Sequence, residues 1–202
     1  AIDQAIRIDK DFARAYATRA ELAFYKKDWK NLVNYAKKAY ELAPLDAATV
    51  GHISYIVTLS GMGCKESEEI KLKYKLDKDV CYRLEWGGEL SKLGNELDSV
   101  STLSFDNYGL GQYYQETNQW DKMLAIFEAV PSPDFHWWNF NMGMAHHYLG
   151  NTSKANEYLN VIKPLYGEKP LEKLLEGQLM WNNHFHYTEY FQDILKSKYW
   201  KN

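Results

Sequence analysis

A helical pattern that restarts at a fixed interval most constrains how this chain can fold. Apolar residues recur at three- and four-residue spacing from Ala13 to Leu42, interrupted by a polar break at 26–28. Asp28 can cap the helix that follows this break, and Pro44 comes after that helix ends. The same pattern begins again near Ala47, 34 positions after Ala13. Repetition at this period is typical of stacked helical hairpins that share one core. We therefore predict an all-α fold.

A small residue recurs at one place in each helical unit. Ala20, Ser54, Gly111 and Gly143 occupy matching positions. A small side chain lets paired helices approach closely, and glycine in a helix interior costs about 1 kcal/mol relative to alanine. The recurrence therefore indicates a packing requirement.

These units resemble the tetratricopeptide repeat family, whose first helix carries W-x2-L-G-x2-Y and whose second carries A-x3-F. The best matching segments are Asn139-x2-Met142-Gly143-x2-His146 with Ala155-x3-Leu159, and Asn107-x2-Leu110-Gly111-x2-Tyr114 with Met123-x3-Phe127. The resemblance implies an α-α superhelix, a solenoid of antiparallel helical hairpins.

Four segments, 11–17, 130–138, 145–150 and 190–195, are similar to the C-terminal repeat regions of bacterial signalling proteins. In that family the repeats follow a class III adenylate cyclase domain or a winged-helix DNA-binding domain, so the resemblance implies an upstream effector domain. The helical pattern is already under way at Ala1. We therefore expect the chain to be a fragment of a longer protein.

The predicted organisation is one repeat domain over 1–202. Its parts are 1–12 as the end of a preceding repeat, repeats at 13–46, 47–79, 80–103 (degenerate), 104–135 and 136–166, and terminal capping helices at 167–202. In 80–103 we expect one helix ending at Gly94, and residues 95–103 are too few for a full second helix. Pro131 and Pro164 are expected to shorten their helices by about a turn.

Composition excludes several classes of protein. Lys plus Arg is 24 and Asp plus Glu is 27, a net charge of −3, which argues against nucleic-acid binding. No apolar run approaches the ~20 residues of a membrane span, so we expect no membrane insertion and a cytoplasmic location, or a periplasmic one if a membrane span precedes the chain. Cys64 and Cys81 are the two cysteines; two free thiols are favoured, and a bridge between them stays open.

Neither a cofactor, nor a metal, nor an active site is predicted. His146 and His147 are adjacent, and His184 and His186 are two apart, so none forms the i, i+4 pair of a helical metal site. The sequence contains no G-x-S-x-G, no P-loop and no dinucleotide fingerprint. The pattern favours a protein that is not an enzyme.

Aromatic residues make up 15% of the chain, and the repeat positions place some of them on the concave face that first helices line in this family. The predicted partner-binding residues are Glu21, Phe24, Tyr25, Tyr55, Tyr108, Gln112, Gln115, Trp137, Phe140, Met144, His147 and Tyr148. Burial of these rings against neighbouring helices is the equal alternative. Alanine at Trp137 and Phe140 would separate the two, because only groove residues would weaken binding without lowering the melting temperature.

The function expected from this pattern is a non-catalytic interaction module that captures a peptide, a helix or its own effector domain. Two alternatives stay open: a small-molecule sensor whose curved repeats enclose a pocket, and a structural spacer that dimerises.

Overall fold

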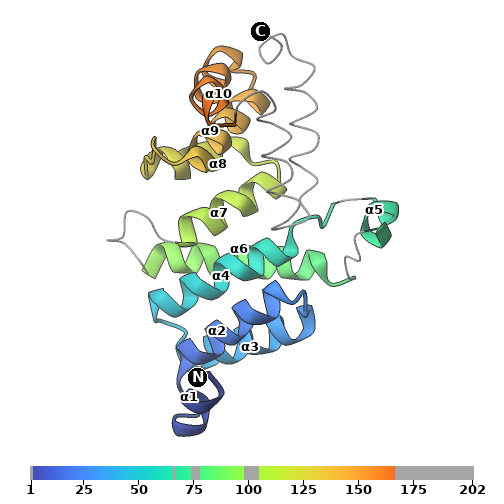
Figure 1. The fold of residues 1–202 in the computed structure, drawn as a ribbon, viewed down its shortest axis with the longest axis vertical. Coiled ribbons are helices and arrows are strands. Elements are labelled where there is room, and N and C mark those ends of the chain that lie inside the picture. The colour runs from blue at the N-terminus through green and yellow to red at the C-terminus, as the bar shows by residue number, and fades with distance from the viewer. Residues whose placement is uncertain (1, 66, 74–77, 98–104, 167–202) are drawn as a thin grey trace. The chain divides into compact units, whose positions relative to one another are not determined.

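The computed structural model describes residues 2–65, 67–73, 78–97 and 105–166, and all regular structure in these ranges is helical (Figure 1). The helices are α1 Ile2–Ile8, α2 Ala13–Tyr25, α3 Trp29–Leu42, α4 Ala47–Gly61, α5 Glu68–Lys73, α6 Val80–Leu97, α7 Phe105–Glu116, α8 Trp120–Ala129, α9 His136–Tyr148 and α10 Thr152–Tyr166. The chain forms two compact units. The first comprises residues 1–64 and 78–113, and the second comprises 65–77 and 114–202.

In the first unit, α2 and α3 form an antiparallel hairpin around small side chains. Ala17 and Ala20 of α2 and Leu32 and Ala36 of α3 are fully buried, so the two helices approach closely. The carboxylate of Asp28 accepts a hydrogen bond from the backbone N–H of Asn31 at 3.2 Å, which confirms the predicted helix cap.

The next hairpin pairs α4 with α6, which differs from the expected division into repeats 47–79 and 80–103. The structure places the short α5 between these two helices in the chain, and α6 continues past Gly94 to Leu97. Gly87, Ser91 and Gly94 are all buried on α6, and Gly87 and Ser91 lie against Thr58 of α4. Gly94 therefore lies within the helix instead of ending it.

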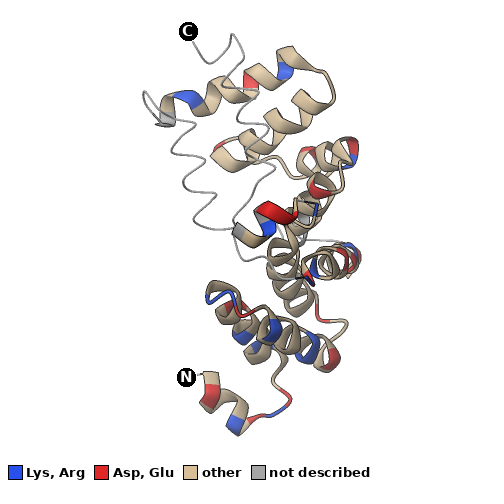
Figure 2. Ribbon diagram, turned by 90° about the vertical axis from the view of Figure 1, so that its right-hand side faces the viewer, with Lys and Arg blue, Asp and Glu red and all other residues tan. Residues whose placement is uncertain are grey.

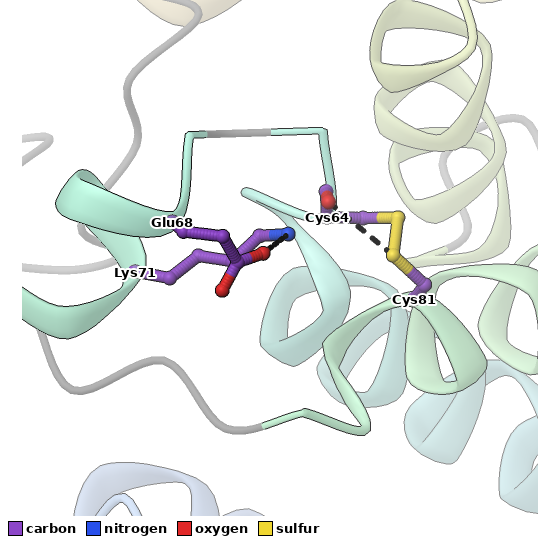
Figure 3. Close-up of a disulfide and its surroundings, with 4 residues drawn as sticks. All are labelled: Cys64, Glu68, Lys71 and Cys81. Atoms are coloured by element: carbon purple, nitrogen blue, oxygen red, sulfur yellow. Dashed lines mark hydrogen bonds and ion pairs between the residues drawn. A yellow bond between two sulfur atoms is a disulfide. The ribbon is translucent and has the colours of Figure 1, made fainter.

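Cys64 and Cys81 form a disulfide, so the favoured expectation of two free thiols is wrong (Figure 3). Cys64 follows α4, and Cys81 lies in the first turn of α6. The pairing of these two helices brings the Cα atoms of the cysteines to 4.6 Å from each other, a separation within the range of disulfides. On α5, which the bridged segment contains, Lys71 Nζ pairs with Glu68 Oε1 at 3.1 Å (Figure 3).

In the second unit, α9 and α10 form a hairpin, and α8 also packs against α9. The indole N–H of Trp138 donates to the backbone carbonyl of Phe127 at 2.9 Å and so joins α9 to α8. Helix α8 ends before Pro131 as expected, but α10 continues through Pro164, so the predicted shortening there is wrong. The predicted capping helices at 167–202 lie outside the described residues.

Candidate interaction surface

Five polar and aromatic side chains lie on three helices of the first unit, and we call this set the Glu21 face. It consists of Glu21 and Tyr25 on α2, His52 and Tyr55 on α4, and Tyr108 on α7. Spacings of four residues on α2 and three on α4 place each pair on one side of its helix. Gly109 brings α7 close to α4, because a Cβ atom there would lie 3.4 Å from the Cα of Tyr55.

Hydrogen bonds fix the carboxylate of Glu21 in this face. Its Oε2 lies 3.0 Å from His52 Nε2, a contact that joins α2 to α4. Its Oε1 accepts a weaker hydrogen bond from the Tyr25 hydroxyl at 3.5 Å. The side chains of Glu21 and His52 are 34% and 32% exposed, so the pair is reachable from solvent.

The three tyrosines of the Glu21 face all remain protonated at neutral pH. Burial raises the pKa of Tyr25, and the neighbouring charge of Glu21 raises it further. Burial also raises the pKa of Tyr55, and it raises the pKa of Tyr108 to about 12. Each of the three side chains is therefore a neutral phenol, and the exposed ring of Tyr25 offers an aromatic surface to a ligand.

Of the residues predicted in the first unit, Glu21, Tyr25, Tyr55 and Tyr108 retain exposed surface, whereas Phe24 and Gln112 are buried. Phe24 packs edge-on against Trp29 with ring centroids 6.2 Å apart, so it belongs to the core of the hairpin. His52 was missed in the sequence. It could have been predicted from its position three residues before Tyr55, which places both residues on the same side of the helix.

The residues predicted in the second unit divide in the same way. Trp137, His147 and Tyr148 are partly exposed, but Gln115, Phe140 and Met144 are fully buried, so these three cannot be reached by a ligand in this structure. Tyr148 stacks on Trp120 with ring centroids 4.2 Å apart. Since its exposed aromatics also pack on one another, this region is a weaker candidate than the Glu21 face.

Acidic and basic residues are mixed along the helices (Figure 2). Within the described ranges, no three His, Cys, Asp or Glu side chains are grouped so as to hold a metal ion. In the same ranges, none of the helices combines the length and the apolar character that crossing a membrane requires.

No protein-family model matches this chain, and no curated protein is significantly similar to it.

Proposed function

We propose that the chain is a tetratricopeptide-like repeat module that binds a protein segment on the Glu21 face and performs no catalysis itself. Two features support the repeat assignment. The four matching small residues, Ala20, Ser54, Gly111 and Gly143, are all buried. Trp29 and Trp120 occupy equivalent places, as the first residues of α3 and α8.

The observation that carries the binding function is the combination of accessible tyrosines with an anchored carboxylate on three helices. Tyrosine is enriched at the energetic centres of protein interfaces, because it buries a large apolar ring and still donates a hydrogen bond. The Tyr25 side chain is 56% exposed, although its neighbour on α2, Phe24, is buried. We infer that the partner is an extended peptide or a helix, and an upstream effector domain of the same protein is one source of such a segment.

A selection from a random dodecapeptide library displayed on phage tests this proposal. Peptides enriched on the wild-type chain are synthesised, and their affinities are compared with those for Tyr25→Ala. The matched control is Tyr82→Ala, which removes a similarly exposed tyrosine from α6 (45% exposed).

We expect Tyr25→Ala to weaken binding at least tenfold and Tyr82→Ala to leave it unchanged, with both variants folded by circular dichroism. Peptides that bind Tyr25→Ala as tightly as the wild type would overturn the proposed function.

A further inference from the structure

We propose that the Glu21 face receives a cationic side chain of the bound segment, with arginine preferred over lysine. This inference rests on the proposed function and adds to it the chemistry of the partner. It follows from three features of the face, which are the spare hydrogen-bonding capacity of the Glu21 carboxylate, the lack of a lysine or arginine paired with it among the described residues, and the tyrosine rings of the same face.

Glu21 has hydrogen-bonding capacity left over. A carboxylate oxygen can accept about two hydrogen bonds. In the described structure each oxygen of Glu21 has one contact, with Tyr25 on one side and His52 on the other. These two contacts hold the carboxylate in place. Its solvent-exposed side can still accept two parallel N–H hydrogen bonds from a bound partner.

No lysine or arginine of the described residues pairs with this carboxylate. The two arginines of α2 are engaged elsewhere. Arg14 lies 3.7 Å from Asp46, and Arg19 pairs with Asp3 while its guanidinium lies over the ring of Tyr35. Among the described residues, the histidine ring of His52 is the basic group within 4 Å of this carboxylate. The charge of Glu21 is therefore not paired with a permanently charged side chain, so it can attract a partner's cation and repel an acidic segment.

The rings favour a cation at the same place. A guanidinium or ammonium group is attracted to the face of a tyrosine ring, more strongly when water is partly excluded. Tyr25, whose hydroxyl contacts Glu21, offers an exposed ring, and Tyr55 and Tyr108 are the partly buried rings of the same face. The first unit already uses this contact internally, since the guanidinium of Arg83 lies 5.0 Å from the ring centroid of Trp29.

Arginine fits this surface better than lysine. Its planar guanidinium binds a carboxylate through two parallel hydrogen bonds and stacks on aromatic rings, whereas the ammonium of lysine is a compact and strongly hydrated charge. A hydrogen bond to a charged group is stronger than one between neutral groups. Loss of the arginine–carboxylate pair should therefore lower the affinity by about tenfold or more.

The test uses the peptides selected on the wild-type chain whose binding depends on Tyr25. In the tightest one, each arginine is replaced in turn by citrulline, its neutral isostere. We expect one replacement to weaken binding at least tenfold and lysine at that position to weaken it less. Glu21→Gln should reduce the affinity for the arginine peptide equally and leave that for the citrulline peptide unchanged. The matched control is Glu89→Gln, at an exposed glutamate on α6.

The outcomes separate this inference from the proposed function. The proposal of a cationic partner is overturned if peptides need Tyr25 but contain no essential basic residue, or if they bind Glu21→Gln as well as the wild type. Either result is compatible with the proposed interaction module. If no selected peptide depends on Tyr25, both proposals fail. The citrulline comparison uses the wild-type chain, so its result does not depend on how well Glu21→Gln folds.

Discussion

Phe140 and Trp137 are three residues apart on α9 and have different surroundings. The side chain of Phe140 is fully buried, and Trp137 packs edge-on against it with ring centroids 5.7 Å apart. Trp137 keeps part of its surface exposed. Phe140 therefore contributes to the stability of the second unit and is not available to a ligand.

We expect Phe140→Ala to lower the free energy of unfolding by about 3–5 kcal/mol, because it removes a buried ring and leaves a cavity. Urea unfolding followed by circular dichroism measures this loss. The control is Phe135→Ala, whose ring is 41% exposed and which should cost about 1 kcal/mol or less. Equal losses for the two variants would show that Phe140 is not a core residue.

His146 is a buried histidine at the C-terminal end of α9. It is 2% exposed, its ring stacks on Tyr158, and its Nε2 is buried with no hydrogen-bond partner in the described structure. Burial lowers the pKa of His146, and the nearby charge of Lys154 lowers it further, while Glu128 and Glu157 act in the opposite direction. Protonation of this ring therefore opposes folding.

This histidine predicts a pH dependence of stability. Since the pKa of His146 is lower in the folded chain than its ordinary value of about 6.5, the unfolded chain binds the proton first as the pH falls. The free energy of unfolding should therefore decrease below about pH 6.5. Between pH 7.5 and 5.5, wild type should lose more stability in urea unfolding than His146→Gln. Parallel losses in the two proteins would contradict this role.

Among the described elements, α4 and α6 approach each other closely. A Cβ atom at Gly87 of α6 would lie 2.5 Å from both the backbone nitrogen and the hydroxyl of Thr58 on α4. Real Cβ atoms do not approach so closely, and backbone atoms cannot rotate away. The pairing of these helices therefore depends on glycine at this position.

Gly87→Ala tests this close approach, because two effects oppose each other. Alanine in a helix interior is favoured over glycine by about 1 kcal/mol, whereas overpacking costs about 1–3 kcal/mol. We expect the steric cost to prevail and the midpoint of urea unfolding to fall. Glu89→Ala, an exposed position on the same helix, should change it little. A midpoint raised by Gly87→Ala would show that the helices can separate without cost.

At the scale of the whole molecule, the disulfide joins two residues of the same unit, whereas residues 65–77, between them in the sequence, are grouped with the second unit. Both Cys64 and Cys81 lie in the first unit, and 17 positions separate them in the sequence. A bridge that closes a loop of this length stabilises a fold by about 3 kcal/mol, mainly by restricting the unfolded chain. Reduction should therefore affect the two units unequally.

Hydrogen exchange before and after reduction measures this difference. We expect the amides of α4 and α6 to exchange faster in the reduced chain, or in a Cys64→Ser, Cys81→Ser variant, and those of α9 and α10 to keep their protection. Equal acceleration in all four helices would mean that the units unfold as one.

The sequence by itself determined the helical class, the start of α2 at Ala13 and of α4 at Ala47, and the cap at Asp28, because spacing and capping are local properties. Glu21, Tyr25, Tyr55 and Tyr108, which the repeat positions predict as partner-binding residues, retain exposed surface, and their binding role stays a prediction. Tertiary structure decided the pairing of α4 with α6, the disulfide and the burial of Phe24, Phe140 and Met144. These depend on which distant helix covers each side, and a periodic pattern carries no information about that partner.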